Sequence, residues 1–127
     1  MNEIKIENFV INSSSEPFTI AEAGINHNGD LGIALRMIEA AKLTGISAIK
    51  FFTYQTEEFI IDSELEYSYK SMGNDVVESM KEMFQRCEFS KNDWKKIKHK
   101  CDEENILFLS TPENVSDLDF LVELGMK

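Results

Sequence analysis

Polar residues stand near the carboxyl ends of three apolar segments that are typical of β-strands. Glu22 follows the first segment, Lys50 lies within the second, and Ser110 and Thr111 follow the third. The segments are residues 18–21, 47–52 and 106–109. In a parallel sheet these ends meet at one edge, where α/β folds place active sites. Together the residues could bind an anion and transfer a proton. A buried ion pair between Glu22 and Lys50 is the structural alternative, although desolvation can outweigh its Coulomb gain.

A polar loop at residues 24–30 follows the first of these strands and precedes a helix, which is the position of a phosphate-binding turn. It matches neither GxGxxG nor GxxxxGK[ST], and Asp30 places negative charge where a phosphate would lie. We therefore do not expect a nucleotide loop. Asn26, His27 and Asn28 are hydrogen-bonding groups at the active edge, and Asn26 is a candidate substrate ligand. His27 could act as a general base or serve only to position its neighbours.

The order of elements along the chain predicts an α/β protein. Apolar residues recur at helical spacing between Asp30, a candidate N-cap, and Gly45. The same spacing recurs in a second helix that follows Ser90 and in a last helix that ends at Gly125. The strands between these helices are apolar on both faces, as in a parallel sheet covered by helices. Residues 4–11 alternate loosely, as a short strand or hairpin does. We see one domain or part of one.

The stretch from residue 54 to residue 73 is mixed in character and long for a connection within a compact domain. Loops of this length are usually functional or disordered. Asn74 or Asp75 is then positioned to cap a helix whose apolar face runs from Val76 to Cys87. This places Asn74 at a helix start beside the long loop.

Composition excludes several classes of protein. The chain has 127 residues, with 13 Lys and Arg against 23 Asp and Glu, and a net charge of −10 argues against nucleic-acid binding. It contains no apolar run of about 18 residues, so we expect no membrane span, and residues 1–12 lack a signal-peptide core. A cytoplasmic location is the expectation. Cys87 and Cys101 fall on apolar helix faces and are predicted to be buried free thiols. Without a CxxC pair, and with widely separated histidines, a zinc site is not expected.

Several segments together resemble the sialic acid synthase family, which includes N-acetylneuraminate, legionaminate and pseudaminate synthases and relatives in spore-coat polysaccharide biosynthesis. The resemblance rests on IAEAGINHNGD at residues 20–30, AIKF at 48–51, GN at 73–74 and FLSTP at 108–112. It extends over most of the chain, and the first segment is long enough to be specific.

The resemblance implies a TIM (β/α)8 barrel, of which residues 1–127 would be the N-terminal part, about three βα units, because such a barrel takes about 250 residues. The rest of the barrel and an antifreeze-like domain would be absent. It also implies a transferase that condenses phosphoenolpyruvate with an N-acylated amino sugar such as N-acetylmannosamine. A divalent metal, Mn²⁺ or Mg²⁺, is implied as a Lewis acid, with ligands outside this chain. A homodimer is implied for the full-length protein.

By matching motif positions, the resemblance assigns Glu22 to contact the sugar and assist proton transfer. It assigns Lys50 and Thr111, with Ser110 beside it, to bind phosphoenolpyruvate, and Asn74 to contact the sugar. One departure is Phe52, which stands where the family usually has Gln in a K-x-Q-T pattern.

Two alternatives remain open at this point. One is another phosphoenolpyruvate-dependent keto-deoxy sugar acid synthase, although such enzymes lack the NHNG loop. The other is a truncated, non-catalytic interaction fragment, since three βα units cannot close an eight-stranded barrel. If the chain is part of a sialic-acid-type synthase, we expect the 127-residue chain alone to be inactive.

Overall fold

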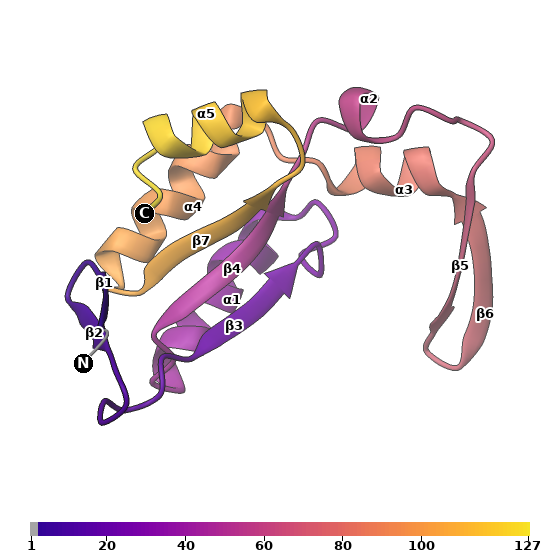
Figure 1. The fold of residues 1–127 in the computed structure, drawn as a ribbon. Helices are drawn as coiled ribbons and strands as arrows, with labels where there is room; N and C mark the ends of the chain where they lie inside the picture. The colour runs from indigo at the N-terminus through magenta and orange to yellow at the C-terminus, as the bar shows by residue number, and fades with distance from the viewer. Residues whose placement is uncertain (1–2) are drawn as a thin grey trace.

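A computed structural model describes residues 3–127, so the first two residues of the predicted 1–127 segment lie outside the description. The chain begins with an antiparallel hairpin of β1 (Ile4–Ile6) and β2 (Phe9–Ile11). It lies near the amino ends of the strands of the main sheet (Figure 1). The predicted hairpin is confirmed.

The main sheet contains, within the described residues, three parallel strands in the order β3-β4-β7. They are β3 (Ile20–Gly24), β4 (Ala48–Thr53) and β7 (Leu107–Pro112). The predicted parallel arrangement is confirmed, but the ends of the strands differ from prediction. Glu22 and the Ser110–Thr111 pair lie inside their strands, because hydrogen bonding to β4 continues past the apolar residues.

Helices α1 (Leu31–Leu43), α4 (Lys91–Glu103) and α5 (Val115–Glu123) pack together with the sheet around one apolar core. In Figure 1, α1 and α4 lie behind the sheet and α5 runs along β7. The predicted cap at Asp30 is confirmed, because its side chain accepts a hydrogen bond from the Ile33 amide. Ser90 caps α4 in the same way by accepting one from the Asp93 amide. The side chains at the centre of this core are Ile38, Ile49, Phe51, Ile97, Phe108 and Leu121.

The expected long loop is instead ordered secondary structure. A short helix α2 (Thr56–Phe59) leads to an antiparallel hairpin of β5 (Glu66–Ser71) and β6 (Asn74–Ser79), and then to α3 (Met80–Cys87). Met72 and Gly73 join the strands and both have positive φ, as a type I′ turn requires. The predicted helix start at Asn74 or Asp75 is therefore wrong.

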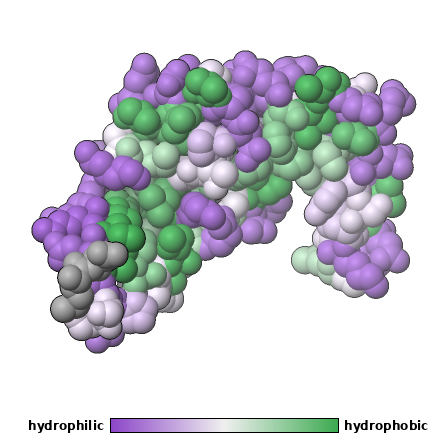
Figure 2. Space-filling view, viewed as in Figure 1, coloured by the Kyte–Doolittle hydropathy of each residue, from purple (hydrophilic) through white to green (hydrophobic). Residues whose placement is uncertain are grey.

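The hairpin β5–β6 extends away from the sheet as an arm below α3 (Figure 1). In the space-filling view a hollow separates this arm from the body of the protein (Figure 2). The strands of the arm alternate, so Tyr69, Val76 and Glu78 are half-buried while the residues between them are exposed. One face of the arm is thus turned toward the protein.

Candidate active site

Glu22 and Lys50 lie directly opposite each other on neighbouring strands. Lys50 Nζ is 2.7 Å from Glu22 Oε2, so the two side chains form an ion pair. The pair is not buried as expected: the side chains are 36% exposed for Lys50 and 58% for Glu22. The strands alternate, and the helices of the core pack against the opposite face, beside Ile49 and Phe51. Charges this accessible are available to a ligand.

Thr111 lies on the same face as this ion pair. Lys50 is opposite Leu109 in the register, and Phe52 is opposite Thr111, so Thr111 is a diagonal neighbour of Lys50 toward the carboxyl edge. The structure therefore brings three predicted residues to one accessible surface. Lys50 supplies a positive charge for an anion, the Thr111 hydroxyl can donate a hydrogen bond, and the Glu22 carboxylate can accept a proton.

Ser110, by contrast, points to the helix-covered face of the sheet. It is opposite Phe51 in the register and is buried. Its hydroxyl shares a 2.6 Å hydrogen bond with the Thr53 hydroxyl, and its amide lies 3.2 Å from Met126 Sδ. The structure thus does not bring Ser110 to the surface of the Glu22–Lys50 pair, because adjacent residues of a strand point to opposite faces.

Asn74 is also far from the surface predicted for it. It is the first residue of β6, paired with Ser71 beside the turn of the arm, and it is exposed. The arm carries it away from the main sheet (Figure 1). The structure does not bring Asn74 together with Glu22.

Asn26 and His27 belong to the loop between β3 and α1, and both have local structural partners. Asn26 Nδ2 donates a 3.0 Å hydrogen bond to the Ala23 carbonyl. His27 is buried, its ring stacks on Phe89 with centroids 4.2 Å apart, and Nδ1 accepts a hydrogen bond from the Gly29 amide. Burial lowers the pKa of His27 to about 4. His27 is therefore a neutral, buried ring that shapes the loop, which favours the positioning role over the general base.

Phe52 occupies the accessible face of β4, where the family usually has Gln. Its ring packs against Tyr54, Phe59 and Phe84, with centroid separations of 5.4 Å, 5.8 Å and 6.4 Å. These partners come from the residue after β4, from α2 and from α3. The phenylalanine therefore anchors the segment that carries the arm, in place of a polar side chain beside Lys50.

Cys87 and Cys101 are free and buried, as predicted. Burial raises the pKa of both thiols, that of Cys101 to about 12. Within residues 3–127, no three side chains of His, Cys, Asp or Glu are grouped so as to hold a metal ion. The residues of this part of the chain thus do not by themselves fit the metal that the resemblance implies. No helix in the same part is long and apolar enough to cross a membrane.

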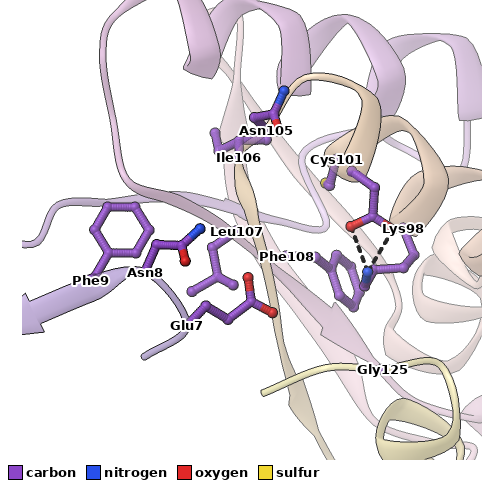
Figure 3. A pocket seen from close by; sticks show the side chains of 11 residues that line it. Glu7, Asn8, Phe9, Lys98, Cys101, Asn105, Ile106, Leu107, Phe108 and Gly125 are labelled. Carbon is purple, nitrogen blue, oxygen red and sulfur yellow. Dashed lines mark hydrogen bonds and ion pairs between the residues drawn. The ribbon is translucent and has the colours of Figure 1, made fainter. Parts of the chain in front are cut away.

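One pocket lies at the amino end of the sheet, and Figure 3 shows the side chains that line it. Its volume is about 210 Å³, and it is formed by the β1–β2 turn, α4 and the start of β7. Lys98 in this pocket is paired with Asp102 at 2.6 Å. The α/β folds place their active sites at the opposite edge of the sheet, so this pocket is not part of the candidate site.

A larger pocket, missed from the sequence, lies where the arm, α3 and the loop after β3 meet. Its volume is about 510 Å³. The sequence signal was the pair Tyr67 and Tyr69, spaced two residues apart before Met72 and Gly73. That alternation before a two-residue turn indicates a hairpin with one aromatic face.

Comparisons with known proteins agree with the α/β fold and identify a family. The model of the NeuB family matches residues 37–127. N,N'-diacetyllegionaminic acid synthase of Campylobacter jejuni is 38% identical over 85% of the chain, and the enzyme of that name from Legionella pneumophila is 34% identical over 91%. The chain spans about a third of the length of these relatives, 32% of each.

A solved structure is also similar over nearly the whole chain. It is the N-acetylneuraminic acid synthetase of Leptospira borgpetersenii in complex with citrate, 36% identical, with a TM-score of 0.78 over 98% of this chain and 39% of that one. The chain therefore belongs to the NeuB family, in which its relatives are named as synthases of neuraminic, legionaminic and pseudaminic acids.

Proposed function

We propose that this chain forms part of the active site of a sialic-acid-type synthase. The enzyme condenses phosphoenolpyruvate with the open-chain aldehyde of an N-acylated amino sugar in surface carbohydrate biosynthesis. A bond forms between carbon 3 of phosphoenolpyruvate and the aldehyde carbon, water adds at carbon 2, and inorganic phosphate leaves. The products are a nonulosonic acid and phosphate.

The observation that carries this proposal is the accessible ion pair of Glu22 and Lys50 beside Thr111 on one face of the parallel sheet. Lys50 binds the anionic phosphoenolpyruvate as a point charge, and the Thr111 hydroxyl donates a hydrogen bond to it. When the anion engages Lys50, the Glu22 carboxylate loses its partner and becomes free to accept a proton. Glu22 then contacts the sugar and assists proton transfer.

Strands β3, β4 and β7 would be the first three of the eight strands of a TIM barrel, with the surface of Glu22 and Lys50 facing the barrel interior. A divalent metal, Mn²⁺ or Mg²⁺, would take its ligands from outside this chain and supply Lewis-acid chemistry. Homodimer formation and a cytoplasmic location are further parts of the proposal for the full-length protein.

Binding of phosphoenolpyruvate to the purified chain tests the proposal, measured by isothermal titration calorimetry or by the ³¹P resonance of the ligand. K50M removes the charge at nearly constant side-chain length and is expected to weaken binding at least tenfold. K70M is the matched control, because Lys70 is exposed on the arm, far from Lys50, and is paired with Asp75 at 3.7 Å. Equal binding by wild type and K50M would refute the assignment.

A second candidate function, a non-catalytic interaction fragment, is favoured by an apolar stripe on α5. Val115, Leu118 and Val122 are 74%, 43% and 61% exposed and recur at helical spacing. Self-association through this stripe would appear as a concentration-dependent increase in mass by sedimentation. A monomer at all concentrations would count against it.

A further inference from the structure

The pocket of about 510 Å³ beside the arm has the size and lining of a small-molecule site. Its apolar wall consists of aromatic rings and thioethers from α2, β5 and α3. These side chains are Phe59, Tyr67, Tyr69, Met80, Met83 and Phe84. Such a wall binds carbon–hydrogen surface through dispersion and the hydrophobic effect.

Arg86 lines this pocket, and its charge is paired with a carboxylate on the neighbouring strand β6. Arg86 donates two 3.0 Å hydrogen bonds to the carboxylate of Glu78, which also accepts a 2.7 Å bond from the Tyr69 hydroxyl. The bonds from Arg86, together with that from Tyr69, lower the pKa of Glu78, so this carboxylate stays ionised and paired. The network also joins the arm to α3. The pocket therefore has defined walls and favours an uncharged ligand.

The polar side of the pocket comes from the loop that follows β3. Asn26 and Asn28 line it, and the Asn26 amide is held by its hydrogen bond to the Ala23 carbonyl. This loop starts immediately after Gly24, two residues beyond Glu22. The pocket thus lies at the same edge of the sheet as the candidate active site, and carboxamides on its rim can hydrogen-bond an amide group of a ligand.

We propose that this pocket binds the N-acyl group of the amino sugar and the carbons next to it. The proposal rests on the proposed function and assigns a separate place to each substrate. Lys50 binds the anion, and the pocket, whose Arg86 is paired with Glu78, binds the uncharged acyl group of the second substrate. The acyl chain would lie against Tyr67 and Met80, with the amide directed toward Asn26 and Asn28.

A pocket of this kind makes affinity depend on the length of the acyl chain. Burying one more methylene contributes about 0.8 kcal/mol, which corresponds to about fourfold in affinity. N-Acetyl-, N-propanoyl- and N-butanoylmannosamine should therefore bind with affinities that rise about fourfold at each step. Saturation-transfer NMR titrations of the purified chain measure the three dissociation constants.

Two variants and one control connect this dependence to the pocket. Y67A removes an aromatic ring that is 44% exposed, so the fold should tolerate the change, and it should flatten the series. M80W fills the space and should make the longest acyl chain the weakest ligand. V77A is the control, because Val77 is 59% exposed and alternates onto the opposite face of the same arm. It should keep the wild-type series.

Two results would overturn the assignment. One is a wild-type series that is flat across the three acyl chains, and the other is an equal effect of Y67A and V77A. The phosphoenolpyruvate titration with K50M separates this failure from failure of the proposed function. Intact, Lys50-dependent anion binding with a flat series rejects the pocket alone. An acyl-length series without Lys50-dependent anion binding supports the pocket and rejects the anion site.

Discussion

The buried imidazole of His27 should make the stability of this protein depend on pH. The pKa of His27 is lowered to about 4 by burial, against an ordinary value of about 6.5. Between these values the unfolded chain binds a proton that the folded chain does not, so stability falls as pH falls. The Gly29 amide donates to Nδ1, so a proton on that atom would also break this hydrogen bond.

The linkage relation converts this shift into a free energy of unfolding. The free energy of unfolding falls by about 2 kcal/mol between pH 7.5 and pH 5.0, and by about 3 kcal/mol between pH 7.5 and pH 4. Urea unfolding monitored by circular dichroism at a series of pH values measures it. Asp117 acts in the opposite direction, because burial raises its pKa and favours the folded state at lower pH. The quantity to compare is therefore the difference in free energy of unfolding between wild type and a variant that lacks the imidazole of His27.

H27N is the informative variant because Asn Oδ1 can still accept from the Gly29 amide but does not titrate. H27N should be less stable than wild type at pH 7.5, because the substitution removes the stacking on Phe89. Between pH 7.5 and pH 5.0 its free energy of unfolding should fall by about 2 kcal/mol less than that of wild type. H99N, at an exposed position of α4, is the control for removal of an imidazole. A wild-type minus H27N difference that stays constant from pH 7.5 to pH 5.0 would refute the reasoning.

Three further predictions concern two glycines with positive φ, the N-cap of α4 and the thiol of Cys101. G29A should destabilise the fold by about 2 kcal/mol or more, since φ is +76° and the new Cβ would collide with the Arg86 carbonyl. G73A, also at positive φ but in open space, should lower the free energy of unfolding by about 1 kcal/mol. S90A removes the N-cap of α4 and should cost about 1 kcal/mol in urea unfolding. Cys101, whose pKa burial raises to about 12, should resist alkylation by iodoacetamide at pH 8 until the chain is unfolded.

Each of these predictions has an opposing result. Equal losses for G29A and G73A would mean that the contact with the Arg86 carbonyl is relieved at little cost. An S90A protein as stable as wild type would mean that the cap contributes nothing. Alkylation of Cys101 in the native protein, at the rate of a free thiol, would contradict its burial.

The βα pattern around the sheet could be predicted because its signals are local. Helix caps at Asp30 and Ser90 and apolar strands of matching length determine where those elements start and which face they bury. The segment 54–79 could not be predicted in the same way. Val76 fits both a helix face and a strand face, and the choice depends on pairing with Tyr69 on β5.

The candidate site was predicted in its residue types and only partly in its geometry. Glu22, Lys50 and Thr111 come to one face because each lies at a matching position of a parallel register. Ser110 lies on the other face and Asn74 lies on the arm. The resemblance did not predict this, because a motif match does not state which way a side chain points. The pocket beside the arm is formed by segments distant in sequence, so no single motif contains it.

The amino-acid sequence by itself determined the family, the parallel βα arrangement and the residues that can bind an anion and accept a proton. The family follows from the resemblance of the quoted segments, and the other two properties follow from local periodicity, helix caps and residue chemistry. Only the tertiary structure decided that the Glu22–Lys50 pair is accessible, that His27 is a buried neutral ring, and that a pocket with an apolar wall adjoins the same edge of the sheet. Each of these depends on which face a strand presents and on what packs against it, and long-range contacts settle both.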